Sequence, residues 1–189
     1  MSNINFRNSS FLTSMDSFQK EPEKTLPMVM LVGRSNVGKS SLINALLSSR
    51  LAFSSKKAGK TKLVNYYTVD NRFYLLDTPG YGSTSYANLT TISFAKMMED
   101  GLKKPNLKAI VLLLDLRRDI GKDDLEFIHY LQRSGKPLIV ILTKVDSMNQ
   151  KEKSLARKRA EEAGISRYLE SELTGKANEK IREVIASYI

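Results

Sequence analysis

Apolar residues in this chain form short continuous runs that alternate with stretches of helical spacing. Residues 28–32 and 109–114 are apolar at every position, as expected of strands buried on both faces. Residues 39–49 place Leu42, Ala45 and Leu46 on one helical face. Strands that alternate with helices form a mostly parallel sheet, because right-handed crossovers put helices on both of its faces. The pattern predicts one α/β domain with a six-stranded sheet.

Residues 63–69 and 73–76 are expected to pair as a hairpin, because a short polar turn joins them. Tyr66, Tyr67 and Phe73 fall at strand spacing there, as does Tyr74, and we assign all four to the core rather than to base stacking. The other strands are expected at residues 28–32, 109–114, 138–142 and around 167–170. The helices are expected at residues 39–49, 89–102, 123–133, 152–163 and 179–188.

The first 24 residues are polar and rich in Ser and Asn, with few periodic apolar positions. We expect a flexible extension here, or one held by a few contacts such as those of Phe6 and Phe11, followed by a domain at residues 25–189. The chain shows neither a secretory leader pattern nor an apolar run of about 20 residues, so we expect a cytoplasmic protein that does not enter a membrane. It has no cysteine, which excludes disulfides and thiolate metal sites.

The most specific motif lies between the first predicted strand and the first predicted helix. It fits the pattern G-x-x-x-x-G-K-[ST], whose glycines let the backbone wrap a phosphate. Successive N–H groups and the helix N-terminus then stabilise the negative charge. Lys39 is expected to reach the β- and γ-phosphates, and the Ser40 hydroxyl to bind Mg²⁺. The motif consists of Gly33, Arg34, Ser35, Asn36, Val37, Gly38, Lys39 and Ser40.

ATP and GTP both bind such a loop, so the base must be selected elsewhere. Thr143, Lys144, Val145 and Asp146 follow the predicted strand at residues 138–142, at the sheet edge where ligands bind in these folds. The Asp146 carboxylate can accept both the N1–H and the exocyclic amino group of guanine, a pair of donors that adenine lacks. The stem of Lys144 can cover the base, and Thr143 stands where Asn is usual. The motif predicts GTP or GDP as the ligand.

A D-x-x-G motif, Asp77-Thr78-Pro79-Gly80, ends the strand predicted at residues 73–76. Asp77 is expected to face Mg²⁺ through water, and the Gly80 N–H to meet the γ-phosphate. Loss of that phosphate would release the segment from about residue 81 to 89 as the second switch. Tyr81 stands where Ras-like enzymes carry a water-orienting Gln, so we expect slow intrinsic hydrolysis.

Three further positions complete the predicted site. Thr61 is the candidate for the first switch, closing over Mg²⁺ together with Ser40 and Asp77 as metal ligands. Lys39, Thr61 and Gly80 are the residues expected to act in hydrolysis. Asn36 either helps to hold a K⁺ ion, as an Asn at this place does in related GTPases, or only packs or caps. The loop expected to support the guanine O6 consists of Ser171, Glu172 and Leu173.

The formal net charge is +10, from 30 basic and 20 acidic residues. Such an imbalance favours a polyanionic partner, nucleic acid first, although composition or solubility alone also produces lysine-rich surfaces. The basic clusters therefore form either an RNA-facing surface or ordinary solvated helix faces. His129 has no partner motif and is assigned a structural role. The clusters contain Lys103, Lys104, Arg117, Arg118, Lys151, Lys153, Arg157, Lys158 and Arg159.

Together these motifs resemble the EngB family, also called YihA or YsxC, bacterial GTPases needed for ribosome assembly. The most specific matches are residues 33–46 and residues 59–65. The resemblance implies a Ras-like P-loop fold, Mg²⁺-dependent GTP hydrolysis, and action on the large ribosomal subunit or its precursor, through rRNA and ribosomal proteins. A need in cell division and septation would follow from that role. The resemblance also assigns nucleotide contacts to Ser41, Gly59, Lys60, Thr61, Lys62 and Leu63.

Two other functions are alternatives to a ribosomal switch. The closer alternative is a GTP-regulated RNA-binding protein that acts on a non-ribosomal RNA. Nucleotide-dependent transport or membrane remodelling would need a membrane span or an amphipathic anchor, and the sequence displays neither. A small basic domain without heptads or an evident apolar patch is expected to be a monomer.

Overall fold

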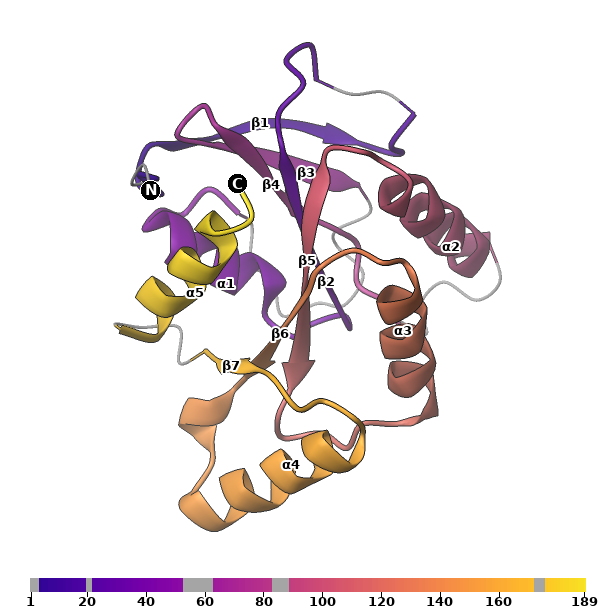
Figure 1. Ribbon diagram of the computed structural model, residues 1–189, viewed down its shortest axis with the longest axis vertical. Helices are drawn as coiled ribbons and strands as arrows, with labels where there is room; N and C mark the ends of the chain where they lie inside the picture. The colour runs from indigo at the N-terminus through magenta and orange to yellow at the C-terminus, as the bar shows by residue number, and fades with distance from the viewer. Residues whose placement is uncertain (1–3, 20–21, 53–62, 83–88, 172–175) are drawn as a thin grey trace.

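The computed structural model describes residues 4–19, 22–52, 63–82, 89–171 and 176–189. Within them, seven strands form one sheet in the order β1-β3-β4-β2-β5-β6-β7 (Figure 1). The five strands from β4 to β7 in this order pair in parallel, while β3 and β1 are antiparallel additions at one edge. The strands are β1 (Ser9–Met15), β2 (Met28–Gly33), β3 (Val64–Val69), β4 (Phe73–Asp77), β5 (Leu107–Asp115), β6 (Leu138–Thr143) and β7 (Leu169–Glu170).

Helices cover both faces of the sheet, as the sequence predicts. In Figure 1, α1 and α5 lie side by side on one face, α2 and α3 lie on the other, and α4 lies at the end of the molecule farthest from β1. Because both faces are covered, β2 and β5 are buried along nearly their whole length, which explains their continuous apolar runs. The helices are α1 (Lys39–Leu47), α2 (Leu89–Leu102), α3 (Lys122–Arg133), α4 (Gln150–Glu162) and α5 (Lys176–Ala186).

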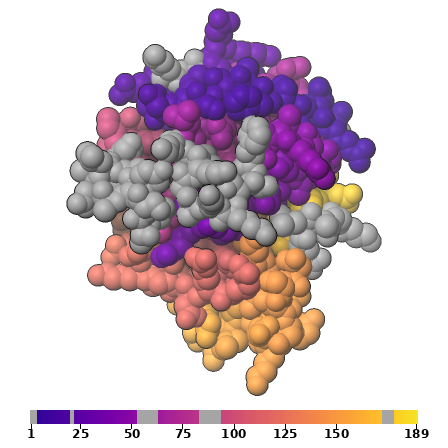
Figure 2. All heavy atoms as spheres, turned by 180° about the vertical axis from the view of Figure 1, so that it is seen from behind, coloured from indigo at the N-terminus to yellow at the C-terminus, as the bar shows by residue number. Residues whose placement is uncertain are grey.

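The N-terminal segment supplies a seventh strand, so the expectation of six strands is wrong by one. Strand β1 pairs antiparallel with β3, from Ser9 opposite Val69 to Met15 opposite Val64. It is an edge strand that is exposed or half-buried throughout, so it lacks the apolar alternation that identifies a strand in a sequence. Figure 2 shows these indigo residues lying across one end of the molecule, against the rest of the folded body.

Aromatic side chains attach this segment to the sheet. Phe6 is 5% exposed and meets Phe73 edge to face, with ring centroids 5.7 Å apart. Phe11 is 47% exposed but still meets the buried Tyr67 ring at 5.8 Å. Tyr66 and Tyr74 pack against each other in the core, so the prediction that the hairpin aromatics serve packing is confirmed.

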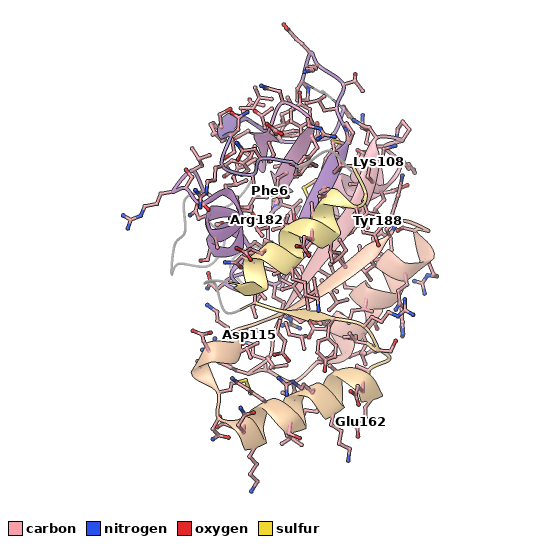
Figure 3. All side chains as sticks on the ribbon, turned by 60° about the vertical axis from the view of Figure 1, so that its left-hand side comes forward. Phe6, Lys108, Asp115, Glu162, Arg182 and Tyr188 are labelled. Atoms are coloured by element: carbon pink, nitrogen blue, oxygen red, sulfur yellow. The ribbon has the colours of Figure 1, made fainter. Side chains whose placement is uncertain are left out.

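The C-terminal helix fixes the end of α1. The Arg182 guanidinium donates hydrogen bonds to the carbonyl oxygens of Leu46 and Ala45, at 2.7 and 2.9 Å, and to the Ser48 hydroxyl at 2.9 Å. These carbonyls belong to the last turn of a helix and have no partner within it. The same guanidinium lies over the Phe6 ring, 5.8 Å from its centroid (Figure 3). Arg182 therefore joins α5, α1 and the N-terminal segment.

None of the helices in the described ranges is long and apolar enough to cross a membrane.

Candidate nucleotide site

The loop between β2 and α1 takes its shape from backbone conformations that favour glycine. Gly33 has φ +155°, and a Cβ there would meet the Leu113 carbonyl oxygen at 2.8 Å. Gly38 has φ +111° at the start of α1, and Asn36 also has a left-handed φ of 64°. These conformations turn the chain back before α1, and the N–H groups of the first turn of a helix, which have no partner within the helix, suit an anion.

The Lys39 side chain folds back against this loop. Its ammonium group donates to the carbonyl oxygens of Gly33 and Arg34, at 3.1 and 3.2 Å, and its side chain is almost fully buried. Burial lowers the pKa of Lys39 to about 8, against an opposing effect of the nearby Asp77 carboxylate. An ammonium group held in this way, poor in water contacts, is a strong partner for phosphate oxygens.

Asp77 at the end of β4 and Ser40 at the start of α1 form a pair of oxygen donors. The Ser40 hydroxyl donates to Asp77 Oδ2 at 2.7 Å, and Asp77 is 1% exposed. Its other oxygen, Oδ1, is buried and has no hydrogen-bond partner among the described residues. Burial raises the pKa of Asp77, while Lys39 and Ser40 oppose that shift. A buried carboxylate oxygen without a partner, beside a hydroxyl, suits a hard cation such as Mg²⁺.

The D-x-x-G segment lies against the phosphate loop. The Ser35 N–H donates to the Tyr81 carbonyl oxygen at 3.0 Å, and the Tyr81 N–H donates to the Gly33 carbonyl oxygen at 3.3 Å. Gly80 is so close that a Cβ there would lie 2.6 Å from the Ser35 Cα and backbone N. Thr78 is buried and its hydroxyl donates to the Leu31 carbonyl oxygen at 2.7 Å. The segment is thus joined to β2 on both sides of Pro79.

The Tyr81 side chain extends to α3, beside Arg34 of the phosphate loop. Its hydroxyl donates to Asp124 Oδ1 at 2.8 Å, and its ring centroid lies 4.5 Å from that of Phe127. Arg34 of the loop donates from Nε to the same Asp124 oxygen at 2.7 Å. Asp124 belongs to none of the motifs that predict the site. Its only sequence signal is its place three residues after Gly121, where its other oxygen accepts the N–H that begins α3.

The guanine motif is tied to the phosphate loop by Thr143. The Thr143 hydroxyl lies 2.9 Å from the Val37 carbonyl oxygen and 3.2 Å from that of Leu114, so it is within donating reach of both. Beyond it, Lys144 adopts a left-handed φ of 66°, and the Asp146 side chain is exposed. Thr143 therefore fixes the distance between the loop and the residues expected to read the base.

The structure brings most of the predicted site together at the carboxyl end of the parallel strands. Residues 33–41, 77–80 and 143–146 lie at the last residues of β2, β4 and β6, in the segments that follow them and in the first turn of α1. Ser171 follows β7, and its N–H donates to the Leu142 carbonyl oxygen at 2.9 Å. Leu63 is described and exposed. Gly59, Lys60, Thr61, Lys62, Glu172 and Leu173 lie outside the described residues.

Comparison with known proteins supports the assignment of a nucleotide site. Residues 28–144 match the family described as 50S ribosome-binding GTPase. A probable GTP-binding protein EngB of Cytophaga hutchinsonii is 44% identical over 153 residues, which cover 79% of this chain and 77% of that protein. Its counterpart in Lactobacillus helveticus is 40% identical over 146 residues, or 76% and 74% of the two chains.

Solved structures share the fold at lower identity. The crystal structure of a probable GTP-binding protein engB has a TM-score of 0.67 at 22% identity, covering 86% of this chain and 98% of the other. Era of Aquifex aeolicus bound to GDP·AlF4⁻ has a TM-score of 0.69 at 22% identity, covering 88% and 57%. These likenesses confirm the Ras-like α/β fold, and the sequence matches confirm the family resemblance. The chain therefore belongs to the EngB family of GTP-binding proteins and is a GTPase.

Proposed function

We propose that this GTPase is a nucleotide-dependent switch that acts in the cytoplasm on the large ribosomal subunit or its precursor during assembly. The observation that carries the switch is the contact of Gly80 and Tyr81 with the phosphate loop. A γ-phosphate held by Lys39 would lie beside this contact, so its presence or absence would change the conformations open to the segment after Tyr81. The ribosomal target is supported by the family description and by the net charge.

The residues of the chain would divide the chemistry among them. Lys39 would neutralise charge on the β- and γ-phosphates, and the Gly80 N–H would donate to the γ-phosphate. Tyr81 is turned toward α3, so its side chain is not placed to orient the attacking water. Hydrolysis would therefore be slow without help from another group, as the sequence predicts.

Ser40 and Asp77 fit a Mg²⁺ ion, with Thr61 as the third expected ligand. When bound, Mg²⁺ supplies positive charge that offsets the charge developing on the phosphate oxygens. The fit rests on the partnerless Oδ1 of Asp77 and on its contact with the Ser40 hydroxyl. We expect removal of Mg²⁺ with a chelator to weaken GTP binding more than GDP binding, because the γ-phosphate adds charge that the metal would offset.

Charge supports a polyanionic partner, but not through the basic clusters as a whole. Even if all 20 acidic residues were paired, ten of the 30 basic residues would keep uncompensated charge. Several cluster members, however, form ion pairs with acidic neighbours. These pairs are Lys103–Glu99, Arg117–Asp115, Arg118–Asp115, Arg157–Glu170, Lys158–Glu162 and Arg159–Asp119. Binding to a specific partner is therefore expected to persist at a salt concentration that abolishes nonspecific electrostatic attraction.

The test is co-sedimentation with large-subunit precursor particles, in a non-hydrolysable GTP analogue or in GDP, at about 50 and about 200 mM salt. We expect association that requires the GTP form and persists at the higher salt. The Asp146→Asn variant should not associate when nucleotide is limiting. The control is Asp16→Asn, which changes an exposed carboxylate in the N-terminal segment and should associate as the wild type does.

Equal association in both nucleotide states, abolished by salt, would contradict the ribosomal proposal and leave the GTPase activity standing. GTP-dependent retention of a non-ribosomal RNA, without ribosomal particles, would support the alternative function. A defect in division or septation after depletion is expected only together with a loss of mature large subunits.

A further inference from the structure

One carboxylate joins three parts of the molecule that lie far apart in the sequence. Asp124 Oδ1 accepts from the Tyr81 hydroxyl at 2.8 Å and from Arg34 Nε at 2.7 Å. Asp124 Oδ2 accepts the Gly121 N–H at 3.0 Å, which fixes the carboxylate at the start of α3. Its side chain is 7% exposed. We call Arg34, Tyr81 and Asp124 the latch.

The ring contacts of Tyr81 hold its hydroxyl in place. The Arg34 guanidinium lies 5.6 Å from the Tyr81 ring centroid, and the ring centroids of Phe127 and Phe94 lie 4.5 and 6.5 Å from it. Burial first, and then the Asp124 carboxylate, raise the pKa of Tyr81. The hydroxyl therefore remains a donor at neutral pH.

The main chain of Tyr81 carries this constraint to the phosphate loop. Both its N–H and its carbonyl oxygen bond to the loop, at Gly33 and Ser35. Gly80, one residue earlier, lies against Ser35 with no room for a side chain. A fixed Tyr81 side chain therefore fixes the direction of the Gly80 N–H, which is the group expected to meet the γ-phosphate.

A pocket borders the latch. Arg34, Tyr81 and Asp124 line a pocket of about 100 Å³ that is open to solvent, together with Arg118 and Ile120. Residues of the phosphate-binding side, Lys39 and Ser40, are not among its lining residues. The pocket therefore lies between the phosphate loop, Tyr81 and the start of α3.

We propose that Asp124 is a positioning residue for the GTP state: by holding Tyr81 to Arg34, it keeps the Gly80 N–H directed at the γ-phosphate. It touches no reacting atom. Because GDP has no γ-phosphate, the latch contributes to the affinity for GTP and to turnover, and it contributes little to the affinity for GDP. A merely structural role would instead affect both nucleotides alike.

The decisive variant is Tyr81→Phe, which removes the hydroxyl and keeps the ring. Asp124 retains Arg34 and the Gly121 N–H, so no buried charge loses all its partners. We expect the affinity for a non-hydrolysable GTP analogue, in excess Mg²⁺, to fall about tenfold, the lower end of the scale for one hydrogen bond to a charged group. The affinity for GDP should stay within about twofold, and kcat should fall with the GTP affinity.

Tyr130→Phe is the matched control. It makes the same change on α3, in a ring that stacks on Phe127 at 6.3 Å, and no described contact joins it to Asp124. We expect its ratio of GTP-analogue to GDP affinity to equal that of the wild type. An unchanged ratio in Tyr81→Phe as well would overturn the proposal.

Asp124→Asn tests the carboxylate itself, with thermal unfolding measured in parallel. The amide keeps the size of the side chain but cannot accept from all three donors. We expect a larger loss of the nucleotide ratio than in Tyr81→Phe, and less than additive effects in the double variant, because both changes break the same latch. Equal losses of GTP-analogue and GDP affinity, or additive effects, would show a structural role and contradict positioning.

Discussion

Lys39 shows at the scale of one residue how a phosphate site opposes stability. Its ammonium group is buried among backbone carbonyls, which lowers its pKa to about 8 from 10.5. Between these two values the unfolded chain binds more protons than the folded chain, so stability rises with pH across this window and the desolvation cost is fully present below about pH 8. The buried Lys39 ammonium group therefore lowers the stability of the folded protein when no phosphate is bound.

We predict that the free energy of unfolding of the nucleotide-free protein rises between pH 8 and 10 relative to that of Lys39→Met. The difference should grow by about 1 kcal/mol per pH unit, close to the limit for one titrating group. Denaturant unfolding of both proteins at several pH values measures it. Parallel curves for the two proteins would mean that the Lys39 pKa is not lowered by folding.

Asp146 is exposed beyond Thr143, and its chemistry decides which base it accepts. We predict that Asp146→Asn lowers the affinity for GDP about 100-fold, because two hydrogen bonds to a charged acceptor are lost. The new amide can donate to the 2-oxo group of xanthine, so affinity for xanthosine diphosphate should rise. Competition binding with both nucleotides checks the reversal. An equal loss for both bases would instead indicate a damaged loop.

At the scale of elements, α5 holds α1 in place through Arg182. Its guanidinium satisfies two carbonyls of the last turn of α1 and covers Phe6. The helix that begins at the phosphate loop is thus fixed at its far end by a residue near the end of the chain.

We predict that Arg182→Ala lowers the free energy of unfolding by about 2 kcal/mol, from lost hydrogen bonds to otherwise unpaired carbonyls. Lys180→Ala, an exposed position on the same helix, should change it by less than about 0.5 kcal/mol. Denaturant unfolding of the two variants compares them. Similar values would mean that the contact between the helices contributes nothing specific.

At the scale of the whole molecule, the N-terminal segment belongs to the folded unit. Phe6 is 5% exposed in the same cluster as residues of β3, β4, α1 and α5, whereas Phe11 is 47% exposed at the outer edge. Strand β1 is held to β3 by backbone pairing along its length.

We predict that Phe6→Ala destabilises the protein by about 3 kcal/mol and Phe11→Ala by less than about 1 kcal/mol, because only the first leaves a cavity in the core. Denaturant unfolding of each variant measures the change in its free energy of unfolding. A negligible effect of Phe6→Ala would restore the expectation of a loosely held extension.

The sequence by itself determined the strands from β2 to β7 along the chain, the phosphate loop and the family. Gly33, Lys39 and Ser40 are recognisable because their chemistry needs fixed spacing along the chain, and β5 because burial on both faces leaves a continuous apolar run. Such signals are local, so no knowledge of the fold is needed to read them.

Only the tertiary structure decided the seventh strand, the bond from Thr143 to the phosphate loop and the latch. Strand β1 takes its stability from pairing with β3, so its own residues need no apolar alternation. Arg34 and Asp124 are 90 residues apart, and Val37 and Thr143 are 106 apart. A polar residue whose partner lies that far along the chain leaves no pattern in the sequence, because folding alone brings the two together.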